Sequence, residues 1–193
     1  MAYAAITKPS LHMNTKLYTG NATDDTAITG VGFQPDWTWI KTRGSVKNHA
    51  IFDAVRTATK YIQSNTTAIE GTDATSLKSF DSDGFTLGVG STLSVVNQDT
   101  IEMASWNWKA NGAGVLNEVG SIDSTVSVNT TSGFSIAKYT GDASSGATIG
   151  HGLGSIPKMI IVKNLSIVSN WLVYNYSMSA NGDYALFLDS SSA

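Results

Sequence analysis

Hydrophobic and polar residues alternate along most of this chain in short runs, separated by clusters of Gly, Asn, Asp and Ser. Alternation with a period of two is typical of β-strands with one buried face, and the clusters are typical of turns. The runs predict strands at residues 13–18, 37–40, 50–52, 60–63, 98–108, 122–128 and 134–139. A hairpin is expected where residues 77–80 and 85–87 flank a turn at Asp81–Gly84. No segment has a convincing helical period, so the chain is predicted to be all-β.

Two of the predicted strands are apolar at almost every position. Residues Trp37–Ile40 form the first, and the run Met159–Val162 is wholly apolar. A strand without alternation is typical of the centre of a sheet, where both faces are covered. Both runs are therefore expected to be central strands.

These two runs belong to a longer repeat. The segment Tyr18–Lys41 returns at Tyr139–Lys163: Tyr-Thr-Gly opens both copies, and a proline leads into the apolar strand in each. One single-residue gap aligns the two. The alignment places Ala193 opposite Thr67, so residues 68–110 have no counterpart in the second copy. A tandem duplication with an incomplete second copy is predicted.

The repeat sets the expected domain organisation. We expect an N-terminal arm at residues 1–13, a first β-sandwich unit at 14–112, and a second, incomplete β unit at 113–193. The sequence Asn111–Gly114 is expected to link the units. Many short strands with frequent turns are typical of an antiparallel β-sandwich or jelly roll, which is the predicted fold.

Composition excludes several classes of partner. Charged residues make up 14% of the chain and the net charge is −3, so there is no basic stripe for nucleic acid. The chain has no cysteine, which rules out disulfides and thiolate metal sites. No apolar run approaches the roughly 20 residues that span a membrane. The sequence MAYAAITKPSLHM lacks the basic and apolar regions of a signal peptide, so we expect no membrane insertion and no export by that route.

Tryptophans provide the first candidate binding site. They stand in two pairs, each two residues apart and so on one face of a strand: Trp37 with Trp39, and Trp106 with Trp108. Exposed aromatic rings can stack on sugar rings. The second copy has Met159 and Ile161 in place of the first pair, which favours a core role for that pair. Trp106 and Trp108 remain a candidate aromatic platform.

The polar loop at residues 64–76 provides the second candidate binding site. Recognition residues are concentrated on loops, and this loop is long. Its candidate glycan or receptor contacts are Thr66, Thr67, Glu70 and Asp73, whose oxygens can bind sugar hydroxyls. The alternative is a solvated connection without a partner.

Metal and catalytic patterns are weak. Asp81-Ser82-Asp83-Gly84 resembles part of a calcium loop but lacks the later glutamate, and Asp-Gly is also an ordinary turn sequence. The histidines have no ligand spacing. Asp99 and Glu102 are three apart and therefore on opposite faces of a strand, unlike a glycosidase pair. We expect no catalytic residue, no metal and no cofactor.

Four motifs carry a resemblance when they are taken together and in order. They are YTG…GFQPDWTWIK, FDAVRTATKY, SFDSDGFTLG and WNWK. As a set they resemble a repeated domain of bacteriophage tail fibres and related virion appendages. The resemblance implies a concanavalin-like jelly roll and a location in the virion, after assembly in the host cytoplasm. It implies no biochemical activity, so no residue inherits a role.

The expected function is therefore that of a non-enzymatic virion structural protein, a tail-fibre or appendage subunit that contributes to host attachment. A capsid decoration or head-fibre protein with a structural role is one alternative. A virion enzyme or binding protein for glycans is another. The expected partners are other virion proteins, further copies of the chain, with a trimer favoured, and host surface glycan.

Overall fold

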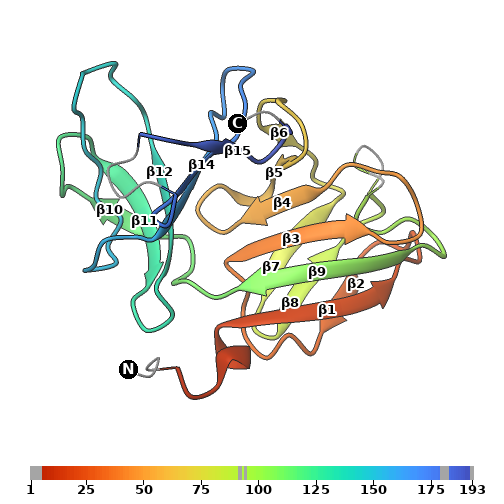
Figure 1. Ribbon diagram of the computed structural model, residues 1–193. Helices are drawn as coiled ribbons and strands as arrows, with labels where there is room; N and C mark the ends of the chain where they lie inside the picture. The colour runs from red at the N-terminus through yellow and green to blue at the C-terminus, as the bar shows by residue number, and fades with distance from the viewer. Residues whose placement is uncertain (1–5, 91–92, 94, 179–182, 192–193) are drawn as a thin grey trace.

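A computed structural model describes residues 6–90, 93, 95–178 and 183–191 (Figure 1). It is all-β, as predicted: the described residues form antiparallel strands in four small sheets. The one helical element among them is a 3₁₀ turn, η1 (Pro9–Leu11), which lies in the predicted arm. Part of that arm, residues 1–5, falls outside the described residues.

The first unit is a sandwich of two sheets. The larger has the order β1-β9-β3-β4-β5-β6. Its strands are β1 (Met13–Thr19), β9 (Glu102–Trp108), β3 (Trp37–Thr42), β4 (Ala50–Asp53), β5 (Thr57–Ile62) and β6 (Gly71–Thr72). The smaller has the order β2-β8-β7, formed by β2 (Thr26–Thr29), β8 (Gly84–Leu87) and β7 (Leu77–Asp81). In Figure 1 the smaller sheet lies behind β1, β9 and β3.

The sandwich core lies between these sheets. Ile28, Ile40, Phe52, Leu77 and Phe85 are among its buried members. Burial of their side chains supplies the main stabilisation of the unit, at roughly 1.5–3 kcal/mol for each large apolar side chain.

Strand β3 sends alternate side chains to opposite sides. Thr38, Ile40 and Thr42 are buried on the inner side, whereas Trp37 and Trp39 are half-buried on the outer side. This tryptophan pair, for which the sequence favoured a core role, lies outside the core between the two sheets. The pair packs against a second apolar cluster, which forms between the two units. Strand β3 is central and has apolar contacts on both faces, as predicted.

The second unit consists of two three-stranded sheets. One has the order β10-β11-β12, from β10 (Val115–Asn117), β11 (Ser124–Asn129) and β12 (Phe134–Tyr139). The other has the order β13-β14-β15, from β13 (Met159–Val162), β14 (Leu172–Asn175) and β15 (Leu186–Phe187). The prediction that Met159–Val162 is a central strand is wrong. Strand β13 is an edge strand of its sheet, and all four of its residues are exposed.

Strand pairing in the second unit repeats that of the first. Strand β3 pairs Trp37 with Asp53 on β4, and β13 pairs Met159 with Asn175 on β14. Both members of the pair move by the same 122 residues, from 37 to 159 and from 53 to 175. This shift equals the offset of the predicted repeat in that region. The register thus agrees with the alignment on which the predicted duplication rests.

The two units meet at Trp171, the residue directly before β14. Its side chain is 1% exposed and packs in a cluster with Ile51 and Ile62 of the first unit. Its indole N–H donates to the backbone oxygen of Gln63 at 3.0 Å. The second unit therefore covers part of the outer face of the large sheet, as Figure 1 shows beside β4 and β5.

Candidate functional site

Four tryptophans lie on the outer face of the large sheet, and we call this surface the tryptophan face. Strands β3 and β9 are antiparallel neighbours, and their register pairs Trp37 with Trp108 and Trp39 with Trp106. Because alternate residues of a strand face the same side, the two sequence pairs form one aromatic surface. The sequence predicted that each pair shares a face. That both pairs share the same one follows only from the pairing of β3 with β9.

The second unit covers half of this face. The ring of Phe134 stacks on Trp108, with centroids 6.2 Å apart and planes 24° apart. The same phenylalanine meets Trp37 edge-on at 6.4 Å. Trp108, a member of the candidate platform, is therefore occupied by the protein itself. Nothing in the sequence distinguished Phe134 from other apolar strand residues.

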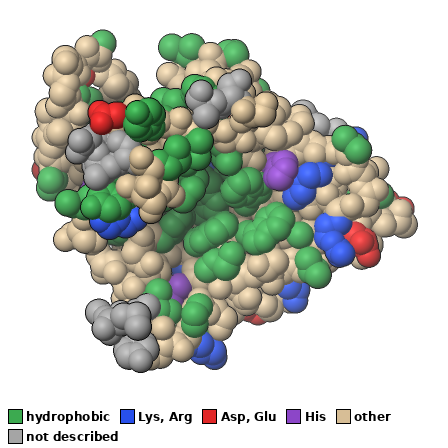
Figure 2. Space-filling model, in the orientation of Figure 1, with side chains coloured by type: hydrophobic (Ala, Val, Ile, Leu, Met, Phe, Trp, Pro, Cys, Tyr) green, Lys and Arg blue, Asp and Glu red, His purple; other side chains and the backbone are tan. Residues whose placement is uncertain are grey.

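The other half remains accessible. Trp39 and Trp106 are half-buried and meet edge-to-face, with ring centroids 6.4 Å apart. The indole N–H of Trp39 donates to Nδ1 of His49 at 2.8 Å. We call these three residues the open platform. Figure 2 shows hydrophobic side chains gathered in the hollow over β3 and β9, beside the second unit.

His49 is held in its neutral form. Partial burial lowers the pKa of His49 below its ordinary value, and the positive charge of Lys41 lowers it further. The neutral ring is required, since Nδ1 accepts the hydrogen bond from Trp39 and cannot carry a proton. Sequence reasoning missed this pairing. The β3–β4 hairpin was the available signal, because it returns the chain beside Trp39.

We expect the protein to lose the stability contributed by the Trp39–His49 contact as the pH falls. The folded pKa of His49 is lowered, so the unfolded chain binds the proton more readily, and stability decreases as the pH drops from 6.5 toward the folded pKa. Tryptophan fluorescence and thermal melting between pH 8 and pH 5 would show the loss. His49→Gln, whose side chain does not titrate there, should show a smaller change. Equal pH dependence of the parent and His49→Gln would contradict the attribution of the loss to His49.

The candidate loop at residues 64–76 contacts the second unit. The backbone oxygen of Thr67 accepts hydrogen bonds from the N–H of Ser169 at 3.1 Å and from Lys163 at 3.2 Å. Glu70 donates its backbone N–H to Leu165, and its carboxylate pairs with Arg56 and Lys60. The Thr66 hydroxyl donates to the backbone of Gln63. The loop thus forms part of the junction between the units.

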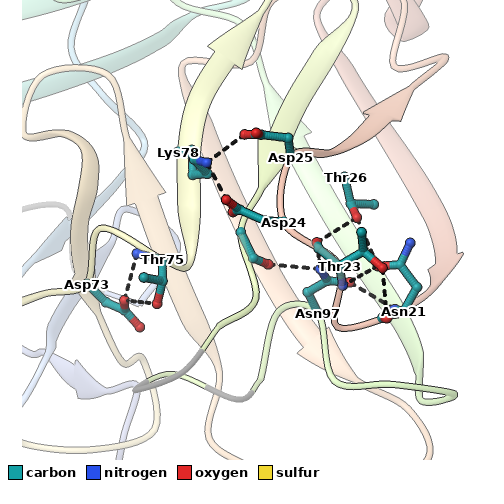
Figure 3. Close-up of polar contacts among 10 residues, drawn as sticks. Asn21, Thr23, Asp24, Asp25, Thr26, Asp73, Thr75, Lys78 and Asn97 are labelled. Carbon is teal, nitrogen blue, oxygen red and sulfur yellow. Dashed lines mark hydrogen bonds and ion pairs between the residues drawn. The ribbon is translucent and has the colours of Figure 1, made fainter.

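Asp73, the fourth candidate of this loop, points inward. Its carboxylate accepts hydrogen bonds from Thr75, from the Ser76 hydroxyl and from the backbone N–H of Leu93; Figure 3 shows the pair with Thr75. Burial acts to raise the pKa of Asp73, but the hydrogen bonds from Ser76 and Thr75 outweigh it and lower the pKa. The carboxylate fixes the chain at this point and is not presented to solvent.

The acids of the Asp81–Gly84 turn also have structural partners. Asp83 accepts the backbone N–H groups of Gly32 and Gly30, which lowers its pKa. Both glycines have positive φ, so the bend they form suits residues without a side chain. Asp81 accepts from the hydroxyls of Ser79 and Thr86. The turn is therefore tied to the loop after β2.

A polar cluster holds the loop between β1 and β2 (Figure 3). Buried Asn97 accepts the backbone N–H of Asn21 and donates to the backbone oxygen of Thr23. Beside it, Lys78 forms ion pairs with Asp24 and Asp25. One lysine thus pairs with both acids at the surface.

Two absences hold for the part of the chain that the structure describes. It contains no group of three or more His, Cys, Asp or Glu residues placed to hold a metal ion. It also contains no helix with the length and hydrophobicity that a membrane crossing requires.

Comparison with known proteins gives one match. A family model described as "Domain of unknown function (DUF7483)" matches residues 8–193. No curated protein and no solved structure matches the chain. The matched region includes both units and every strand described above. The chain therefore belongs to the DUF7483 family, a domain of unknown function.

Proposed function

We propose that this chain is a non-enzymatic structural subunit of a bacteriophage tail fibre or a related virion appendage, and that its open platform binds host surface glycan. The virion location rests on the motif resemblance. The binding role rests on one observation: the neighbouring side chains of Trp39 and Trp106 are half-buried beside His49, and Figure 2 shows a hollow with hydrophobic side chains over their strands, β3 and β9. Ligand sites are typically concave and aromatic, with a few placed polar groups, and this hollow has those features.

The surroundings of the buried acids support binding over hydrolysis. Glycosidases need two carboxyl groups about 5–9.5 Å apart across the sugar bond. Asp36 accepts the backbone N–H groups of Ala110 and Gly112, and Asp53 pairs with Arg56. Burial raises the pKa of Asp36, but its oxygens are directed at the link between the units. The open platform itself consists of two tryptophans and a histidine.

We expect Trp106→Ala to weaken glycan binding by about 5- to 150-fold. Flat ligand rings stacked on an aromatic side chain lose about 1–3 kcal/mol when it is removed, as alanine substitutions of base-stacking residues indicate. The purified chain would be titrated with polysaccharide from the host surface and tested as a competitor of phage adsorption. Tyr184→Ala, which removes an exposed aromatic ring on the second unit, is the matched control.

The outcomes separate the alternatives. Equal binding by Trp106→Ala and the parent would exclude the open platform as the glycan site. Shortening of the polysaccharide during the titration would favour the glycan-degrading alternative. Antibody labelling of intact particles in the electron microscope tests the location: label on tail appendages supports the proposal, and label on the head supports the capsid decoration alternative.

A further inference from the structure

Strand β13 is an exposed edge. Its residues Met159, Ile160, Ile161 and Val162 are 54%, 42%, 38% and 37% exposed, and it is the last strand on its side of the β13-β14-β15 sheet. An edge strand presents unpaired backbone groups and can pair with another chain. Proteins protect such edges with charged residues, prolines or bulges. Strand β13 itself contains no charged residue, no proline and no bulge. Pro157 and Lys158 precede the strand, and Lys163 follows it.

The backbone groups that face the free edge can be identified. The N–H of Tyr176 donates to the oxygen of Lys158, which therefore faces β14. Backbone direction alternates along an antiparallel strand, so Ile160 and Val162 also face β14. Met159 and Ile161 must then direct their N–H and C=O groups to the free edge.

The first unit shows which strand lies beside the edge that corresponds to the free edge of β13. Strand β3, which pairs with β4 in the same register as β13 with β14, has β9 on its other side. The N–H of Arg43 donates to Glu102 of β9, so the alternate residues Trp39 and Trp37 face β9. These are the positions that correspond to Ile161 and Met159. In the second unit, among the described residues, no strand fills the corresponding place.

We propose that the edge of β13 is an acceptor site for one antiparallel β-strand supplied by a neighbouring subunit of the assembly, in the place that β9 occupies beside β3. The pattern of β9 defines the chemistry of this strand. Its aromatic residues Trp108 and Trp106 stand opposite positions 37 and 39, and small polar residues alternate with them. The incoming strand places large apolar side chains beside Met159 and Ile161. Main-chain hydrogen bonds supply affinity and the alternate side chains supply specificity. This inference rests on the proposed role of the chain as a subunit of an assembly, and it does not depend on the glycan proposal.

A peptide of residues 101–109, which contains β9, is a direct probe. We expect the labelled peptide to bind the full chain saturably in fluorescence anisotropy, with one peptide per chain. A scrambled peptide of the same composition should not bind. Amide hydrogen exchange should become slower at Met159 and Ile161 on binding, because their N–H groups gain partners.

Two substitutions at the edge make the test specific. Ile161→Pro removes an edge-facing N–H and leaves the bonds to β14 intact, so peptide affinity should fall at least about tenfold. Ile156→Pro, at an exposed isoleucine outside the strand, should bind like the parent. If Ile161→Pro does not fold, Ile161→Lys and its control Ile156→Lys provide the same comparison, since a charged edge also opposes pairing.

Three results would overturn the proposal. The first is peptide binding that survives both Ile161 substitutions. The second is protection of amides elsewhere in the chain with none at Met159 and Ile161. The third is a dimer in sedimentation that Ile161→Lys dissociates and the peptide does not, which would show that β13 pairs with β13 of a second copy.

Discussion

Replacing Trp171 with alanine should lower the free energy of unfolding by about 3–5 kcal/mol, which is the cost of removing a large buried aromatic side chain and leaving a cavity. The indole is 1% exposed and contacts Ile51 and Ile62 across the junction between the units. The substitution also leaves the backbone oxygen of Gln63 without the indole N–H. Chemical denaturation followed by circular dichroism measures the change.

The same substitution should uncouple the units. Since Trp171 is the fully buried side chain that the second unit contributes to this cluster, its loss should turn one cooperative transition into two. Trp106→Ala is the control, because Trp106 is half-buried and belongs to the first unit alone. A parent-like midpoint and a single transition for Trp171→Ala would contradict the proposed junction.

Arg56→Met should destabilise the first unit by about 3–5 kcal/mol, because it leaves a buried carboxylate without its cation. Asp53 is almost fully buried, and its oxygens accept the Arg56 guanidinium and the Arg56 backbone N–H. The guanidinium also donates to the backbone oxygen of Ile51 at 3.3 Å and to Glu70 at 3.3 Å. Methionine retains the apolar part of the side chain and none of these bonds. Thermal melting and denaturant titration would both record the loss.

A double substitution tests the cause. Asp53→Asn combined with Arg56→Met removes the buried charge but retains an oxygen that accepts the backbone N–H. It should recover much of the stability lost in the single variant, since neutral replacements of buried ion pairs are often tolerated. If the double variant is as unstable as Arg56→Met alone, lost packing rather than an unpaired charge explains the effect.

The Asp53–Arg56 pair joins residues three apart in the sequence, whereas the Trp171 contacts join segments far apart, and the same is true of the candidate site. The open platform depends on β9, which inserts between β1 and β3 although it begins 83 residues after the end of β1 and 60 residues after the end of β3. Pairing of such distant segments depends on which alternatives bury the most apolar surface. Local alternation does not contain that information.

The sequence by itself determined the features that depend on neighbouring residues. Alternation and turn residues predicted the all-β fold and the hairpin at residues 77–87, because side-chain period and backbone bends are local properties. The pairing of Met159 with Asn175 is offset from that of Trp37 with Asp53 by the same number of residues as the predicted repeat. The glycan loop and the aromatic platform remain predictions, with their members now located.

Tertiary structure decided which face each residue takes. In Trp37–Ile40 each face has at least one large apolar residue, so the strand pattern cannot show that the tryptophans face outward and Ile40 inward. The position of the second sheet settles it. Asp73 belongs to a polar loop and is expected in solvent, yet hydroxyl and N–H donors from later in the chain enclose it. The exposure of β13 has the same origin: an apolar strand is buried only where another strand and another sheet are present to cover it.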